Sequence, residues 1–231
     1  MKSKAWTEKF MQGVFFIAAC ASVLAVALIC IFLFANGIPA MKEIGFGNFL
    51  SGKMWKPKNE IFGILPMIVG SLYVTAGAII FGVPIGILTA VFMAYYCPKK
   101  IYKPLKAATE LLAGIPSVVY GFFGLVVIVP LIRTIGRDLG FGGNGSSILT
   151  ASLLLGMMIL PTIIGLTESS IRAVPPHYYE GAVALGATHE RAIFRVVIPA
   201  AKSGVIAAIV LGVGRAIGET MAVIMVAGNQ A

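Results

Sequence analysis

Charged residues are scarce in this chain of 231 residues, and acidic residues are the scarcest of them. Only 12% of the residues are Asp, Glu, Lys or Arg, about half of what a water-soluble protein usually carries. Hydrophobic residues make up 58% of the chain. A soluble globular protein is therefore excluded, because too few polar side chains remain to cover its surface.

Cysteine is also rare, and its spacing excludes the usual metal and redox motifs. Cys20, Cys30 and Cys97 form no CxxC pair and have no Cys/His spacing that could hold a metal or a redox dithiol. The two histidines, His177 and His189, stand near no cluster of cysteines or carboxylates. We therefore expect no metal site, and we expect both histidines to be solvated loop residues.

The apolar residues collect into five blocks of membrane-spanning length, and the short segments between them hold most of the charges. The blocks are residues 10–35, 64–96, 111–132, 148–166 and 205–228. A short segment, residues 1–9, precedes the first block, and a polar loop, residues 36–63, follows it. The sequence therefore predicts an all-α, polytopic membrane protein with five transmembrane helices.

Lysine and arginine are unevenly distributed between the two sides that these blocks define. One side, which includes residues 1–9, collects 11 of them, and the other side, which includes residues 36–63, collects 6. The side richer in Lys and Arg is cytoplasmic by the positive-inside rule. The prediction is a cytoplasmic N-terminus and an external loop over residues 36–63.

Small residues recur at four-residue spacing on several of the predicted helices, which allows close helix contacts inside a bilayer. These residues are Gly82 and Gly86, then Gly204, Ala208 and Gly212, and finally Gly214 and Gly218. The pattern predicts packed helices and indicates no particular activity.

The longest polar segment inside the chain, residues 169–203, predicts two short amphipathic helices. Apolar residues recur in it at helical intervals, and Gly186 interrupts the pattern. Pro199 is expected to end the second helix before the fifth apolar block. A rigid helical knob of this kind can dock into a groove of another protein, and an interfacial loop is the alternative interpretation.

The fifth apolar block is the only one with charges near its middle. Arg215 and Glu219 are four residues apart, so on a continuous helix they share one face and can pair. Because an isolated charge in a bilayer is costly, both side chains are expected to face the bundle interior or a water-filled path. Such residues usually mark transport routes, and a structural ion pair between helices is the alternative.

The polar segment resembles the EAA motif of bacterial ABC importer permeases, which reads Glu-Ala-Ala, three residues, Gly, nine residues, Ile, one residue and Leu-Pro. The residues that carry the resemblance are Glu180, Gly181, Ala182, Gly186, Val196, Ile198 and Pro199. Three of them depart from the motif, Gly181, Val196 and Ile198, but they keep its size and apolarity. The resemblance implies that residues 169–203 couple the chain to a cytoplasmic ATPase through Glu180, Gly181, Ala182, Gly186 and Pro199.

A second resemblance covers nearly the whole chain. Residues 214–222 (Gly-Arg-Ala-Ile-Gly-Glu-Thr-Met-Ala), residues 110–124, Trp55-Lys56-Pro57 and Phe62-Gly63 are similar to the PstC-type permease family of phosphate ABC importers. The family implies a type I ABC importer (MetI-like) transmembrane domain, with its permease core over residues 64–231. It also implies that Arg215, Glu219 and Thr220 lie on the substrate pathway, and that a sixth helix follows, so the chain is expected to be a fragment.

The same family implies partners and a location. The partners are a second, PstA-like permease subunit, a cytoplasmic PstB-like ATPase dimer and an external PstS-like phosphate-binding protein. The expected location is the bacterial cytoplasmic (inner) membrane. The chain is expected to bind no cofactor itself, and ATP and Mg are expected on the ATPase. Residues 47–53 match the start of a phosphate-binding P-loop, but Met54 replaces the hydroxyl that holds magnesium, so the chain is not expected to be an enzyme.

Three alternatives remain open from the residues. A permease of the same architecture could carry another anion such as sulfate or molybdate. A channel or ion-coupled secondary transporter could use Arg215 and Glu219 without an ATPase, although such proteins usually show a repeat of broken helices. A purely structural subunit is the third alternative.

Overall fold

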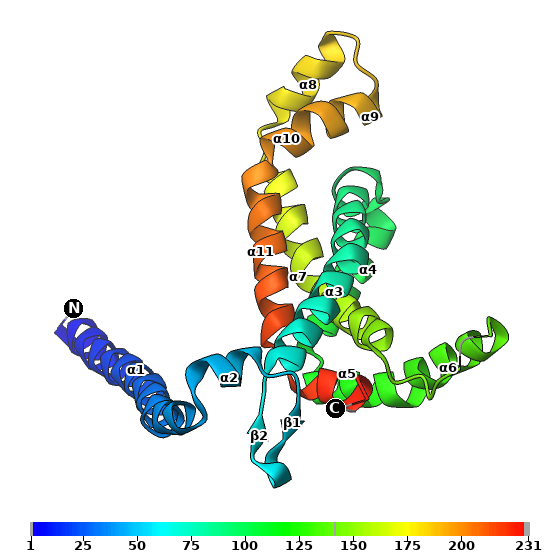
Figure 1. The fold of residues 1–231 in the computed structure, drawn as a ribbon. Coiled ribbons are helices and arrows are strands. Elements are labelled where there is room, and N and C mark those ends of the chain that lie inside the picture. Colours follow the sequence, from blue (N-terminus) through cyan, green and yellow to red (C-terminus); the bar gives the residue numbers. More distant parts are fainter. Residues whose placement is uncertain (1, 141, 229–231) are drawn as a thin grey trace. The chain divides into compact units, whose positions relative to one another are not determined.

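The computed structural model describes residues 2–140 and 142–228, and apart from one small hairpin its regular structure is helical (Figure 1). The prediction of an all-α protein is confirmed. The chain divides into two compact units, Met1–Pro66 and Met67–Ala231. The division falls close to the start of the second apolar block.

The first unit contains a helix that is longer than the first apolar block. Helix α1 (Lys2–Ile44) continues past Ala35, the predicted end of the block, and Pro39 lies inside it. The side chain of Asn36 bonds back to the preceding turn of this helix, since its Nδ2 donates a hydrogen bond to the carbonyl of Phe32 over 2.8 Å. The first part of the predicted loop is therefore a continuation of the helix.

The rest of the predicted loop is ordered as a short helix and a hairpin. The elements are α2 (Phe46–Ser51), β1 (Trp55–Lys56), a 3₁₀ turn (Pro57–Asn59) and β2 (Ile61–Phe62). The strands are antiparallel, and the rings of the paired residues Trp55 and Phe62 meet edge to face at 5.7 Å. At the base of the hairpin, a Cβ on Gly52 would lie 2.6 Å from the Cα of Gly63, so both positions require glycine.

Four helical stretches of the described chain are long and apolar enough to cross a bilayer: Glu8–Ile44, Leu65–Tyr96, Ser117–Asp138 and Ile148–Arg172. The fifth candidate is a bent pair, His189–Ala200 with Lys202–Gly218, whose two helices meet at 70°. Its second member is helix α11 (Lys202–Gly218), whose 17 residues extend about 26 Å, close to the thickness of the hydrocarbon core. The membrane protein predicted from the sequence is confirmed.

The third span begins later than predicted. Residues 111–114 belong to helix α4 (Lys99–Gly114), which ends where Ile115 adopts an extended conformation before Pro116. A residue that precedes proline avoids the helical region, which explains this boundary. The span itself consists of α5 (Ser117–Phe123), a π-helical turn (Gly124–Ile128) and α6 (Val129–Asp138).

Helix α7 (Ile148–Arg172) is the central helix of the second unit, and 61% of its most apolar stretch is buried. On one side lies α3 (Leu65–Val91), where a Cβ on Gly86 would lie 2.7 Å from Ile163. On another side lies α11, where a Cβ on Gly212 would lie 3.1 Å from the same Ile163. The predicted close contacts are confirmed for these glycines, whereas Gly214 and Gly218 face open space.

Candidate functional site

The segment between α7 and α11 forms two short helices that project beyond the ends of both (Figure 1). They are α8 (Pro176–Ala184) and a continuous stretch made of α9 (His189–Ala192), a π-helical turn (Ile193–Val197) and α10 (Ile198–Ala200). Between them, Gly186 has a φ of 85°. Gly186 N–H donates to Val183 O and Ala187 N–H to Ala182 O, the bond pair with which helices end at glycine. The predicted two helices and their hinge are confirmed.

The residues of the EAA-like motif lie on both arms of this hairpin of helices. We call the hairpin the coupling segment (residues 173–201), after the role that the sequence resemblance implies. Glu180 and Gly181 are exposed on α8, and Ala182 is half-buried. Pro199 lies one residue before the end of α10, and the chain then bends into α11, as predicted. Leu185, beside the hinge, is 91% exposed and forms an apolar tip on the segment.

Aromatic rings attach the coupling segment to the π-helical turn Phe92–Tyr96, which follows α3. A hydrogen bond of 2.7 Å joins the Tyr179 hydroxyl to His189 Nδ1. The His189 ring meets Tyr96 edge to face at 5.0 Å, and the rings of Tyr95 and Tyr179 lie 5.8 Å apart. His189 is therefore part of a packed cluster, and the prediction that it is a solvated loop residue is wrong. His177 is exposed on α8, with its ring 4.9 Å from that of Tyr178.

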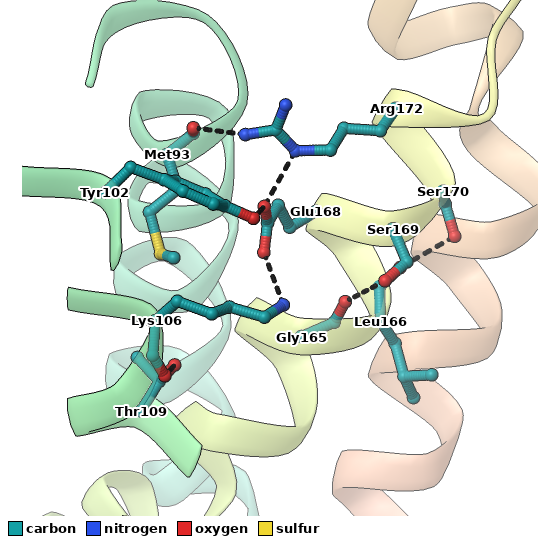
Figure 2. A network of polar contacts seen from close by, with 10 residues as sticks. All are labelled: Met93, Tyr102, Lys106, Thr109, Gly165, Leu166, Glu168, Ser169, Ser170 and Arg172. Atoms are coloured by element: carbon teal, nitrogen blue, oxygen red, sulfur yellow. Dashed lines mark hydrogen bonds and ion pairs between the residues drawn. The ribbon is translucent and has the colours of Figure 1, made fainter. Parts of the chain in front are cut away.

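At the end of α7, a buried carboxylate gathers three donors (Figure 2). Glu168 is 1% exposed. The Tyr102 hydroxyl donates to its Oε1 over 2.6 Å, Lys106 Nζ donates to Oε2 over 2.8 Å, and Arg172 Nε donates to Oε1 over 2.8 Å. Arg172 also donates through Nη2 to the carbonyl of Met93, 2.8 Å away. We call Tyr102, Lys106, Glu168 and Arg172 the Glu168 node.

The carboxylate of the node affects the titration of its two partners on α4. Its hydrogen bond raises the pKa of Lys106, because the ammonium form is stabilised. The same carboxylate raises the pKa of Tyr102, because a phenolate would lose the hydrogen bond to Glu168 and would also be repelled by its charge. Both partners on α4 therefore keep their protons near neutral pH.

Arg215 lies in the last turn of α11, about 20 Å along the helix from Lys202. Its side chain is half-buried, and Nη1 donates a hydrogen bond to Thr162 Oγ1 on α7 over 3.2 Å. The prediction that Arg215 pairs with Glu219 on one helix face is wrong. Helix α11 ends at Gly218, and Glu219 is extended, so the spacing of a continuous helix does not apply.

Glu219 has a different partner in the structure. Its Oε1 accepts a hydrogen bond from the backbone N–H of Ala222 over 3.2 Å, at the start of α12 (Met221–Val226). A carboxylate is favourable there, because the first N–H groups of a helix have no partner within it. Thr220 lies beside it in the break and is exposed. Of the three residues predicted for the substrate pathway, Arg215 therefore contacts α7, and Glu219 and Thr220 form the break.

A cavity of about 320 Å³ lies between α4 and α7, next to the partner of Arg215. Its lining includes Lys106, Thr109 and Glu110 from α4 and Thr162 and Ser169 from α7. It is open to the surroundings and is lined by both polar and apolar atoms. The Glu168 node and the Arg215–Thr162 pair thus border the same cavity, through Lys106 and Thr162 respectively.

Sequence reasoning missed the Glu168 node and Thr162. A signal for the node was present, because Glu168 and Arg172 have the four-residue spacing of a helical ion pair at the end of an apolar block. The partners on α4 are more than 60 residues away in sequence, so no local pattern indicates them. Thr162 is one of several hydroxyl residues on α7, and nothing in the sequence distinguishes it.

The fold is shared with a solved ABC transporter. A chain of the structure described as inward-facing conformations of the MetNI methionine ABC transporter superposes with a TM-score of 0.55 and 22% sequence identity. The similarity covers 71% of this chain and 74% of that one. The chain therefore has a fold found in an ABC transporter, as the sequence predicted.

The family profile described as "Binding-protein-dependent transport system inner membrane component" matches residues 82–231. This range contains the coupling segment, the Glu168 node and Arg215. The fold and the match define the class of this protein, a multi-pass permease subunit of a binding-protein-dependent ABC importer. Such a subunit works with an ATPase and a substrate-binding protein, and it is not itself an enzyme.

Similar proteins of known name indicate the family within this class of permeases. The "Phosphate transport system permease protein PstC" of Mesorhizobium japonicum is 38% identical over 90% of this chain and 69% of its own length. The protein of the same name in Haemophilus influenzae is 33% identical over 98% of this chain and 76% of its own. The "Probable ABC transporter permease protein YqgH" of Bacillus subtilis is 39% identical over 95% and 72%. The chain belongs to the PstC family of permeases.

Proposed function

We propose that the chain is the PstC-type permease subunit of an ATP-driven importer that moves inorganic phosphate across the bacterial inner membrane. Its proposed partners are a PstA-like permease subunit, a PstB-like ATPase dimer and a PstS-like external phosphate-binding protein. The N-terminus is proposed to be cytoplasmic, on the basis of the 11 Lys and Arg residues on its side against 6 on the other. ATP and Mg bind to the ATPase in this proposal, and the chain itself holds no cofactor.

The observation that carries the proposal is the environment of Arg215 in a chain of the PstC family. Arg215 is bonded to a neutral hydroxyl, and the ion pairs of the described residues are the two that Glu168 makes. The guanidinium charge therefore remains available to an anion. A planar guanidinium can bind two oxygens of a phosphate at once, which suits it to attract this anion along a pathway. Glu219 and Thr220 lie in the adjacent break and moderate the attraction, so that the anion can leave again.

The second part of the proposal concerns the coupling segment. Its motif residues Glu180, Gly181 and Ala182 are proposed to seat in a cleft of the ATPase, with Gly186 and Pro199 setting the angles at which the helices meet. The exposed Leu185 at the hinge supports a docking role, because an apolar side chain in this position is best covered by a partner protein. The aromatic cluster around His189 would transmit force from the segment to α3.

The experiment measures uptake of radioactive phosphate by the assembled four-component transporter in proteoliposomes. Arg215→Ala is expected to lower ATP-dependent uptake at least about tenfold, because a charge-assisted contact with the anion is lost. Arg137→Ala is the matched control, since Arg137 is exposed in the last turn of α6, and it should leave uptake unchanged. Normal uptake by Arg215→Ala would remove Arg215 from the pathway. Wild-type uptake of sulfate or molybdate in place of phosphate would reassign the substrate, and uptake without ATP would refute the importer.

A further inference from the structure

The Glu168 node joins three elements at one point. Tyr102 and Lys106 come from α4, Glu168 and Arg172 come from α7, and the carbonyl of Met93 comes from the turn that follows α3. The guanidinium of Arg172 also lies over the Tyr102 ring, 4.7 Å from its centre. Figure 2 shows both oxygens of Glu168 in use, one toward Lys106 and the other toward Tyr102 and Arg172.

One side of the node leads directly to the coupling segment. Arg172 is the last residue of α7, and α8 begins four residues later, at Pro176. Met93 belongs to the same π-helical turn as Tyr95 and Tyr96, whose rings contact Tyr179 and His189 of the coupling segment. A displacement of the segment therefore reaches the node along two routes, through the backbone of α7 and through the aromatic cluster.

The other side of the node leads to the cavity beside Arg215. Lys106 donates to Glu168 and also lines this cavity, together with Thr162, which accepts the hydrogen bond of Arg215. The cavity wall opposite Thr162 is α4, which carries Thr109, Glu110 and Ala113 in addition to Lys106. The position of α4 relative to α7 thus determines the width of the space next to the guanidinium.

We propose that Glu168 is a positioning residue that makes α4 follow the coupling segment, so that closure of the ATPase changes the cavity beside Arg215. A buried carboxylate that loses its donors is strongly destabilised, so the node resists any separation of α4 from α7. The ends of α3, α4 and α7 consequently move as one body when the segment is displaced. This inference rests on the proposed function for the direction of coupling, but the linkage of the three helices does not depend on which anion is carried.

The test uses the assembled transporter in proteoliposomes, with Cys20, Cys30 and Cys97 replaced by serine and a reporter cysteine introduced by Ala113→Cys. Ala113 lies on α4 and lines the cavity, so its rate of labelling by a maleimide reports the state of the cavity. The rate is measured without nucleotide and after trapping of the ATPase with ATP and vanadate. ATP hydrolysis and phosphate uptake are measured in the same preparations, and co-purification of all subunits checks assembly.

With the native node, trapping is expected to change the labelling rate at residue 113. Glu168→Gln should abolish this change and lower the phosphate moved per ATP hydrolysed at least about fivefold, while ATP hydrolysis continues. Glu168→Asp should restore part of the change in labelling rate and part of the phosphate moved per ATP, because aspartate carries the same charge on a shorter side chain. Lys106→Met should act like Glu168→Gln, and Lys103→Met, an exposed lysine of the same helix, should have no effect.

The inference is overturned if trapping leaves labelling at residue 113 unchanged with the native node, or if the change persists in Glu168→Gln. It is also overturned if Glu168→Gln lowers ATP hydrolysis and uptake in proportion and Glu168→Asp does not rescue them, since that is the result for a merely structural residue. Failure of the proposed function is distinct. In that case the wild-type complex moves no phosphate, although nucleotide still changes the labelling rate in a manner that depends on Glu168.

Discussion

Arg215 of α11 donates a hydrogen bond to Thr162 of α7 over 3.2 Å, and this bond connects the two helices next to an open cavity. Glu219, four residues further along, is directed to the N-terminus of α12 instead. The break at residues 219–220 thus separates two charges that their spacing in sequence would pair. In the proposed importer, this separation leaves the guanidinium charge uncompensated and so able to interact with an anion.

Removal of the Thr162 hydroxyl should weaken transport without affecting assembly. Thr162→Val keeps the size of the side chain but leaves Arg215 Nη1 without its acceptor, so the guanidinium loses its fixed position. Phosphate uptake is expected to fall about fivefold, the effect of about 1 kcal/mol for one hydrogen bond. Thr162→Ser keeps the hydroxyl and should retain most uptake. Thr134→Val, on the exposed face of α6, is the matched control, and an equal loss there would contradict the assignment.

Substitution of Gly186 should impair coupling, because its φ of 85° lies in the left-handed region. A Cβ at this position would meet no neighbouring atom, so the cost is conformational, about 1–2 kcal/mol for Gly186→Ala. Gly186→Pro cannot adopt this φ at all and should abolish phosphate uptake driven by ATP. Uptake and co-purification of the ATPase are the measurements. Undiminished uptake by Gly186→Pro would show that the hinge is dispensable.

Close contact between α3 and α7 should make Gly86 intolerant of a larger residue. A Cβ there would lie 2.7 Å from Ile163 Cγ2 and 3.0 Å from Ile163 Cβ, so the backbones must separate. Gly86→Ala is expected to destabilise the protein by about 1–3 kcal/mol, which thermal unfolding of the purified complex in detergent would detect. Gly70→Ala on the same helix meets open space and should be neutral or slightly stabilising.

The contribution of Lys106 to stability should not depend on pH in the neutral range. Because Glu168 raises the pKa of Lys106, the stabilisation is fully present below the ordinary lysine pKa of 10.5 and is lost as pH rises through the raised value. The difference in free energy of unfolding between wild type and Lys106→Met should stay constant from about pH 6 to about pH 9. It should shrink only in more alkaline solution. A difference that declines below pH 9 would contradict the node as described.

Much of the fold could be predicted from the sequence, because the bilayer imposes a length and an apolarity on each spanning helix. The block at residues 148–166 became the central helix α7, and the segment with Gly186 became two helices hinged at that glycine. The residues at which the helices begin and end were less predictable. Helix α1 continues through Pro39, whereas α4 ends just before Pro116, inside a predicted apolar block. Only the surrounding structure distinguishes the two prolines.

The candidate site was predictable only in part. The motif around Glu180 and the intramembrane charge of Arg215 are visible as residue types at characteristic spacings. The prediction that Arg215 pairs with Glu219 was wrong, because it required a continuous helix and α11 ends at Gly218. Of the Glu168 node, only the local pair of Glu168 and Arg172 could be recognised in the sequence, because Tyr102 and Lys106 lie on another helix.

The sequence by itself determined that this protein is a multi-pass membrane protein, that it carries an ABC importer motif between its last two long apolar blocks, and that one arginine lies deep in the last block. These properties follow from composition and from spacings of a few residues, which local chemistry controls. Only the tertiary structure decided the partners of the charges, Thr162 for Arg215 and α4 for Glu168. A buried charge is stabilised by whichever polar group the packing of helices brings within about 3 Å, and that proximity depends on the whole fold.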